Sequence, residues 1–425
     1  MKFFSKTILL ATLVSTASAF SSMIGAGGKI SLDERMTRDV RTLNDWAKQY
    51  GVQYCDGFTL GTYDEVDYFA CSNNAVTTGS PILYVPSNMI ISADAVGQEF
   101  GGSLQQAESV LQQAQLQYQI PLFRIFVKIL VEYEKGSESP YYPWLNALPR
   151  LFKNGAAMTN ACFEALPPYA GYLTQKEKHY SQNFRKVVQM LPFLSDETKN
   201  DLDLMYWAYN VAVTRSMEWN GDRKICPMGD YFNHSADPEV DISFDNDGSL
   251  VVNAARDVPA GTPLRFCYAD PSNPTPLFAT FGFLDESAPA SFCKTMDKLE
   301  EMQELGYTFS NLLFYKETGD ISPEVYDVVL YSILKRNDPN SASDFYKAVM
   351  NRDEAAKNNY HQQYFQYTLE ELRHHVDSTL QELDFLSNKA RGYDVNTHPR
   401  VPVILQHNSH VRETFQRVKD NLDRM

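Results

Sequence analysis

Cysteine is scarce in this sequence and does not occur in the pairs that bind zinc. The chain has 425 residues but six cysteines, and no two of them form a C-x-x-C pair. Zinc knuckles need such pairs, and a disulfide framework needs a higher cysteine density. The sequence therefore argues against a zinc-knuckle domain and against a disulfide-rich domain. We expect most of the cysteines to be small buried side chains: Cys55, Cys71, Cys162, Cys226, Cys267 and Cys293.

Basic residues are also in short supply. The chain has 38 Lys and Arg against 53 Asp and Glu, which gives a formal net charge of −15. Nucleic-acid binding depends on clustered Lys and Arg that neutralise phosphates, and no basic domain is present. The composition predicts no nucleic-acid partner and is compatible with a protein partner.

Long hydrophobic runs are missing except for one short run at the N-terminus. Lys2 and Lys6 flank an apolar stretch near residues 7–14, and Ala17-Ser18-Ala19 follows. A basic region, an apolar region and an A-x-A site are the parts of a signal peptide, and the run is too short to span a bilayer. We therefore predict a signal peptide over residues 1–19 and no stable membrane insertion.

The residues at the predicted cleavage site resemble a targeting signal. Ala17-Ser18-Ala19-Phe20 resembles the bipartite presequence of algae with complex plastids, and residues 21–30 lack acids. This resemblance implies a transit peptide or linker over residues 20–40 and delivery to the plastid through the secretory pathway. Residence in the ER or secretion is the alternative. The glycines in Gly25-Ala26-Gly27-Gly28-Lys29 lack the spacing of a phosphate loop, so we interpret them as linker.

The mature chain alternates between strand-rich and helical regions. Residues 41–50 predict a short amphipathic helix, and residues 53–92 predict short strands separated by turns. Residues 93–204 are mostly helical, including a buried helix over residues 124–136. Strands return after Asn233. A sheet split by a helical insertion is not a Rossmann pattern, and no G-x-G-x-x-G follows a predicted strand.

The second strand region and the tail have clear local signals. Residues 241–255 predict a hairpin whose tight loop contains Asp247-Gly248, because glycine tolerates the positive φ of such a turn. From about residue 289 the pattern is helical to the end. Within residues 368–386 leucines and a valine recur at helical spacing, and Thr368 with Glu371 predicts a capping box. The predicted fold class is α+β, with a split β-rich domain followed by an all-α C-terminal domain.

Several motifs in order resemble the SET-domain methyltransferases of the Rubisco large-subunit lysine methyltransferase type. The first is a Trp-Ala helix that carries Thr214-Arg215-Ser216. A Pro-Met-x-Asp lead into Asn233-His234-Ser235, a Pro-Ala-Gly turn and a strand ending at Tyr268 follow. Phe281-Gly282-Phe283 closes the run, and LVEYEKGSESPYYPWLNALP resembles the insert of that family. The resemblance implies a SET domain over residues 41–288, with its insertion at about 93–204. It also implies a helical substrate-binding domain over residues 289–425.

The resemblance also assigns candidate site residues. It implies S-adenosylmethionine as the cofactor, with Asn233 and His234 against it, Arg215 near its carboxylate, and Phe281 in its aromatic wall. Amides and guanidinium groups have the donors and acceptors that such a ligand needs. Tyr268 corresponds to the catalytic tyrosine, whose hydroxyl accepts weak C–H···O contacts and orients the amine. No metal is required. His374-His375 and His407-x-x-His410 have no acid or cysteine at ligand spacing, so we predict no metal site.

Two positions depart from the pattern of that family. Relatives carry G-x-G in an early strand, where this chain has Glu65-Val66-Asp67, so that carboxylates stand where bare backbone is expected. Phe281 replaces a tyrosine of several relatives, which removes a hydroxyl next to the amine.

The expected activity is methylation of a lysine in a protein substrate, for which a plastid protein is the candidate. Histidine is the alternative acceptor. The missing glycines support a different function, a non-catalytic SET protein that binds peptides or acts as a scaffold. The sequence does not identify the substrate, the number of methyl groups added or the oligomeric state.

Overall fold

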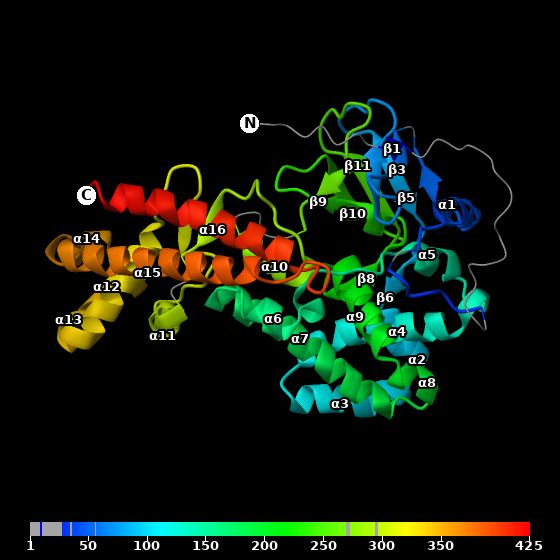
Figure 1. The fold of residues 1–425 in the computed structure, drawn as a ribbon, viewed down its shortest axis with the longest axis horizontal. Helices are drawn as coiled ribbons and strands as arrows, with labels where there is room; N and C mark the ends of the chain where they lie inside the picture. Colours follow the sequence, from blue (N-terminus) through cyan, green and yellow to red (C-terminus); the bar gives the residue numbers. More distant parts are fainter. Residues whose placement is uncertain (1–8, 11–27, 35, 56, 269–272, 294–295) are drawn as a thin grey trace. The chain divides into compact units, whose positions relative to one another are not determined.

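The computed structural model describes residues 9–10, 28–34, 36–55, 57–268, 273–293 and 296–425 (Figure 1). The remainder of the predicted signal peptide, Phe20 and residues 21–27 and 35 of the predicted transit peptide lie outside these residues. The chain divides into two compact units. The first comprises Met1–Phe152 and Lys178–Tyr268, and the second comprises Lys153–Glu177 and Ala269–Met425.

The first unit contains most of the strands. They are β1 (Leu9–Leu10), β2 (Gln53–Tyr54), β3 (Phe58–Thr62), β4 (Tyr68–Ser72), β5 (Pro81–Val85), β6 (Ile91–Ser92), β7 (Met217–Trp219), β8 (Asp222–Ile225), β9 (Asn233–His234), β10 (Val240–Phe244), β11 (Leu250–Ala254) and β12 (Arg265–Phe266). They form four small sheets, ordered β1-β3-β4, β10-β11-β5-β2, β6-β8-β7 and β12-β9.

The four-stranded sheet joins segments that are far apart in the sequence (Figure 1). The predicted hairpin is confirmed: β10 and β11 pair antiparallel, with Phe244 opposite Leu250, and Gly248 adopts a φ of 79° in the loop. Strand β11 then pairs with β5, which precedes the helical insertion. This pairing closes the split sheet around the insertion that the sequence predicted.

The helices of the first unit are α1 (Val40–Gln49), α2 (Ala93–Phe100), α3 (Gln105–Gln113), α4 (Ile120–Glu134), α5 (Tyr142–Ala147), α8 (Asp196–Asn200), α9 (Leu202–Arg215) and the C-terminal half of α7 (Pro168–Val187). Helix α4 is buried because its apolar residues surround most of the helix. Phe123 and Phe126 pack on Phe184, which also contacts Tyr209 on α9 edge to face. This aromatic core holds α9 and therefore Arg215, its last residue.

The second unit is mostly helical. It consists of α6 (Asn160–Phe163), the first half of α7, α10 (Pro274–Phe281), β13 (Ala290–Phe292), α11 (Leu299–Glu304), β14 (Leu313–Tyr315), α12 (Pro323–Asn337), α13 (Pro339–Met350), α14 (Glu354–Gln363), α15 (Phe365–Arg391) and α16 (Val401–Leu422). The helical character of the tail is confirmed. The short antiparallel pair β13–β14 is an addition that the sequence did not predict.

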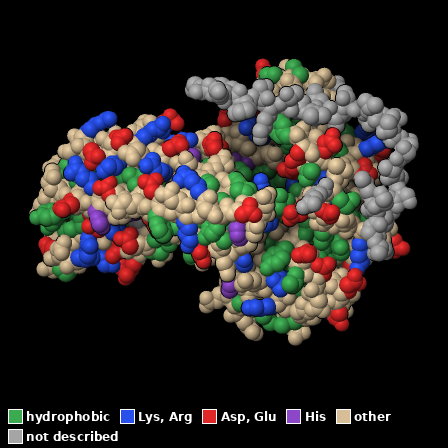
Figure 2. Space-filling view, in the orientation of Figure 1, with side chains coloured by type: hydrophobic (Ala, Val, Ile, Leu, Met, Phe, Trp, Pro, Cys, Tyr) green, Lys and Arg blue, Asp and Glu red, His purple; other side chains and the backbone are tan. Residues whose placement is uncertain are grey.

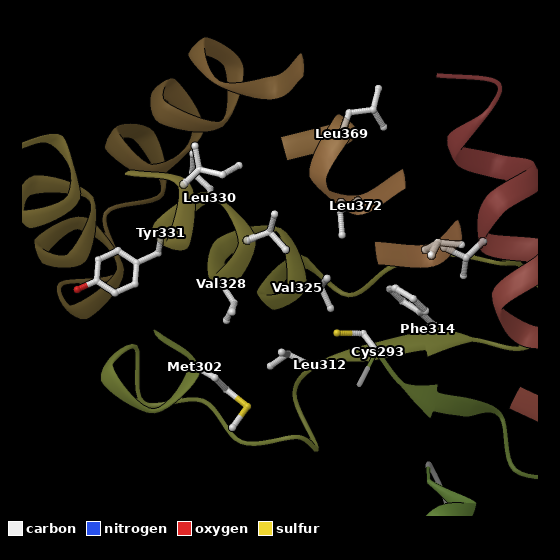
Figure 3. Packing of buried hydrophobic residues seen from close by; sticks show 14 of the residues in the cluster. Cys293, Met302, Leu312, Phe314, Val325, Val328, Leu330, Tyr331, Leu369 and Leu372 are labelled. Carbon is white, nitrogen blue, oxygen red and sulfur yellow. The ribbon is translucent and has the colours of Figure 1, made fainter. Parts of the chain in front are cut away.

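The predicted leucine stripe forms the core of this unit. Leu369 and Leu372 of α15 lie against Val325 of α12 and the residues around Cys293 and Phe314 (Figure 3). The predicted capping box is wrong, because α15 begins three residues earlier, at Phe365. Thr368 is inside the first turn, where its hydroxyl donates to the carbonyl of Tyr364 at 3.2 Å.

The predicted boundary between the SET domain and the helical domain, at residue 288, stays a prediction. The compact units divide after Tyr268 instead and group residues 153–177 with the tail. Over the helices of the tail, acidic and basic side chains are interspersed on the face drawn in Figure 2. No helix among the described residues is long and apolar enough to cross a bilayer.

Candidate functional site

Strand pairing brings the Asn-His segment to the residues that precede Tyr268. Strands β9 and β12 run parallel, with Asn233 opposite Arg265 and His234 opposite Phe266. The amide of Ser235 continues the ladder by donating to the carbonyl of Phe266 at 3.1 Å. Two segments separated by about thirty residues are therefore fixed side by side, as the resemblance implied.

Tyr268 is held at both its backbone and its hydroxyl. Its amide donates to Nδ1 of His234 at 3.1 Å, and its hydroxyl donates to the carbonyl of Phe232 at 2.7 Å. The His234 and Tyr268 rings are 5.3 Å apart and tilted by 56°. Burial raises the pKa of Tyr268, so the phenol is protonated at neutral pH. These contacts leave the ring with little freedom to rotate.

The bond to Tyr268 also determines the state of His234. A nitrogen that accepts a hydrogen bond carries no proton, so a neutral ring has its proton on Nε2. His234 is buried, with 9% of its surface exposed. We infer that His234 positions the tyrosine through the backbone. Asn233, its neighbour, is exposed, and none of the described residues forms a hydrogen bond with its side-chain amide.

Arg215 contacts the short segment that immediately precedes Phe232. Its Nη1 donates to the carbonyl of Asp230 at 2.8 Å, and the guanidinium lies 5.6 Å from the centre of the Tyr231 ring. Asp230 and Tyr231 belong to one turn of 3₁₀ helix, η7 (Gly229–Tyr231), immediately before Phe232. Burial disfavours the charge of Arg215, but the carboxylates of Asp230 and Asp67 outweigh it and raise the pKa of Arg215.

Asp230 is a buried carboxylate to which the sequence analysis gave no role. Its Oδ2 accepts from Nε1 of Trp144 at 3.1 Å and lies 4.0 Å from Nη1 of Arg215. Its Oδ1 is buried without a hydrogen-bond partner among the described residues. Burial raises the pKa of Asp230 to about 6, although Arg215 and Trp144 favour the ionised form. The Pro-Met-x-Asp motif was the signal that pointed to this residue.

The turn between β3 and β4 replaces the glycine pair of the related family. Glu65 keeps a φ of 62°, the left-handed conformation that glycine adopts most readily. The side chains of Thr62 and Asp64 fix the turn: Thr62 Oγ1 accepts from the Glu65 amide at 2.9 Å, and Asp64 Oδ1 accepts from the Asp67 amide at 2.9 Å. Side-chain hydrogen bonds therefore hold this turn, and Glu65 adopts the left-handed conformation in it.

Asp67 lies at the end of this turn, with its side chain exposed to solvent. Partial loss of hydration raises the pKa of Asp67, while the positive charge of Arg215 and, more weakly, that of Arg38 act in the opposite direction. Strand β4, which follows Asp67, packs against η7.

Phe281 belongs to the second unit, whereas Arg215, Asn233, His234 and Tyr268 all belong to the first. It is the last residue of α10, and its ring lies 6.0 Å from that of Phe283. Its placement in an aromatic wall around the cofactor therefore stays a prediction.

Two of the histidines considered as metal ligands, His375 and His407, contact other groups of the fold. Nε2 of His375 lies 2.6 Å from the carbonyl of Cys293, and His407 is buried and stacked on Phe278. Among the described residues, no three His, Cys, Asp or Glu side chains gather as metal ligands.

We predict that Asp230 makes the stability of the protein depend on pH. Its pKa is about 6 in the fold and 3.8 ordinarily, so the fold carries the cost of a buried charge above pH 6 and no such cost below about pH 4. The advantage of Asp230→Asn over the wild type in free energy of unfolding should therefore grow by up to about 3 kcal/mol from pH 4 to pH 6. Urea unfolding at several pH values measures it.

Asp247→Asn, which removes an exposed carboxylate in the hairpin loop, is the control and should show a much smaller change. A difference between Asp230→Asn and the wild type that stays constant with pH, or that shrinks as pH rises, contradicts the assignment.

Comparisons with known proteins agree on the fold. Residues 69–269 match the SET domain family. A crystal structure of the SET domain of LSMT bound to lysine and AdoHcy superposes with a TM-score of 0.63 at 15% identity, covering 91% of each chain. A structure of Rubisco LSMT bound to AdoMet gives 0.62 at 14% identity and covers 92% of each chain. No curated protein matches the sequence. Residues 69–269 therefore match a SET domain, and the chain has the fold of the Rubisco LSMT structures.

Proposed function

We propose that the protein is an S-adenosylmethionine-dependent protein methyltransferase that modifies a lysine side chain. One observation carries the proposal: a phenol, Tyr268, is fixed by two hydrogen bonds beside His234 and Asn233 within a SET domain. The SET fold supports it, as do AdoMet and lysine, the ligands bound in the similar structures.

The residues near Tyr268 fit this cofactor chemically. S-adenosylmethionine carries a carboxylate, an ammonium group, an adenine ring and a sulfonium. The exposed amide of Asn233 offers both donors and acceptors, and the guanidinium of Arg215 is suited to a carboxylate. The buried Oδ1 of Asp230 offers an acceptor that no described residue uses.

The chemistry needs alignment more than acid–base groups. When bound, S-adenosylmethionine supplies an electrophilic methyl group to an amine that attacks in line with the sulfur. Tyr268 remains protonated and donates to Phe232, and a phenol oxygen that donates its proton can also accept contacts from polarised C–H groups and from the amine. A lysine attacks in its neutral form, and transfer from water into a dry site lowers its pKa from the usual value of about 10.4.

The main alternative is a SET protein without activity that binds peptides or acts as a scaffold. Glu65 and Asp67 favour it, because they stand where related proteins have glycine. A histidine ring is a second candidate acceptor, and Phe281 in place of tyrosine favours a change of acceptor or of methylation state.

Calorimetry with S-adenosylmethionine separates these alternatives. We expect the wild type to bind, Asn233→Ala to lose most of the affinity, and Tyr268→Phe to bind but to transfer methyl groups at least about a hundredfold more slowly. Transfer is measured on plastid protein extract, and mass spectrometry of the product distinguishes lysine from histidine.

Two matched variants control for loss of folding. Asn246→Ala removes an exposed amide from the loop between β10 and β11, and Tyr84→Phe removes a hydroxyl that lies 3.0 Å from Ser249 Oγ. Both should bind and transfer as the wild type does. If the wild type does not bind S-adenosylmethionine, the result contradicts the proposed activity and favours the non-catalytic scaffold.

We further propose that the protein acts in a complex plastid on a plastid protein. The Ala-Phe junction at Ala19 and Phe20 supports this location. A fluorescent fusion of the wild type should enter the plastid, and the Phe20→Ala fusion should stop in the ER or be secreted. Plastid entry of the variant contradicts the interpretation of this junction.

A further inference from the structure

Asp67 is the part of the site that the resemblance to other SET proteins leaves unexplained. It stands at the second position of the missing glycine pair, in the turn that leads into β4. The described residues include no Lys or Arg in an ion pair with it within 4.0 Å, although Arg215 and Arg38 favour its ionised form. A glycine at this position would contribute no charge.

The charge of Asp67 acts at the hydroxyl of Tyr268. Three charged groups influence this phenol: Arg215 stabilises the phenolate, whereas Asp230 and Asp67 oppose it. The segment that leads to Tyr268 runs antiparallel to the strand that follows Asp67: the Leu264 amide donates to the Ala70 carbonyl at 2.9 Å, and Cys71 lies opposite Pro263. Arg215 donates to the carbonyl of Asp230, and Tyr268 donates to the carbonyl of Phe232, two residues further along the chain. The three charged groups sum to −1 when both carboxylates are ionised, and to zero if Asp67 is absent.

We propose that Asp67 makes the cofactor site prefer a positively charged sulfonium over a neutral thioether at the position beside Tyr268. This inference rests on the proposed function, in which S-adenosylmethionine binds there and S-adenosylhomocysteine is the product. The two nucleotides differ by one methyl group and one positive charge on sulfur. An additional anion near that sulfur favours the substrate form and weakens retention of the product.

The ratio of the two affinities isolates this effect. Any interaction of Asp67 with the carboxylate and the ammonium group of the ligand cancels in the ratio, because these groups are the same in both nucleotides. What remains is the Coulomb interaction between Asp67 and one charge on sulfur. Across several ångströms of protein with partial solvent access, this interaction corresponds to roughly a tenfold change in relative affinity.

Asp67→Asn is the variant that tests the inference. Asparagine keeps the shape and can still accept from the Tyr68 amide, as the carboxylate of Asp67 does. The carbonyl of Asp67 accepts from the Thr62 hydroxyl and its amide donates to Asp64, so these two bonds involve only the backbone of the residue. Thermal unfolding of the variant verifies that it folds.

Glu65→Gln is the matched control. It removes one carboxylate from the same turn, two residues away and exposed to solvent, and Glu65 is not among the charges that act on Tyr268. The pair therefore separates the position of the charge from the net charge of the protein.

The experiment is calorimetry of the full chain with S-adenosylmethionine and S-adenosylhomocysteine at pH 8 and low salt. Removing Asp67 should shift the affinity ratio about tenfold toward S-adenosylhomocysteine, and higher salt should reduce the shift. Glu65→Gln should leave the ratio as in the wild type. Sinefungin, which carries an amine in place of the methylated sulfonium, should follow S-adenosylmethionine.

Two results overturn the inference in different ways. If the wild type binds both nucleotides and Asp67→Asn leaves their ratio unchanged, or shifts it toward S-adenosylmethionine, the inference fails and the proposed function stands. If the wild type binds neither nucleotide, the proposed function fails and this inference falls with it.

Discussion

The hydrogen bonds that hold Tyr268 against Phe232 and His234 are the constraint on which the site depends. The phenol donates to Phe232, and its amide donates to His234. Both bonds exist because β9 and β12 lie parallel, a pairing of two residues on each strand. Such a short ladder is weak alone. It is stabilised by neighbouring groups, since Glu239 donates its amide to Arg265 and accepts from the guanidinium of the same residue at 2.7 Å.

Charge is the second organising feature of the site. Arg215 and Asp230 are buried together, and neither is fully compensated by the other at 4.0 Å. A buried pair of this kind contributes little net stability, because desolvation offsets the Coulomb attraction. The pair leaves a guanidinium, and a carboxylate oxygen that no described residue hydrogen-bonds, in the electrostatic surroundings of Tyr268. Asp67 adds a third charge from a turn in which related proteins have glycine.

Local sequence patterns predicted much of the fold. The β10–β11 hairpin followed from Asp247-Gly248, and α15 followed from its leucine spacing, because both depend on neighbouring residues. The N-terminus of α15 did not follow, because the helix begins at Phe365, directly after Tyr364, whose ring packs against the core of the second unit. The pairing of β13 with β14 was also missed, because three-residue strands carry little pattern.

The candidate site could be predicted in part, where its residues lie in local sequence motifs. Four of the five proposed residues lie in one compact unit, and the motif order pointed to them. The bond between Trp144 and Asp230 joins residues 86 positions apart, so no local pattern reveals it. The left-handed backbone at Glu65 is equally invisible in the sequence, because a glutamate there argues against a positive φ.

A crystal structure of the protein with S-adenosylhomocysteine tests the central claim most directly. The account predicts that the thioether sulfur lies beside the Tyr268 hydroxyl, with the Asn233 amide and the Arg215 guanidinium in contact with the nucleotide. A nucleotide bound elsewhere, or a recess filled by the Glu65 and Asp67 side chains with no density for the ligand, would contradict it.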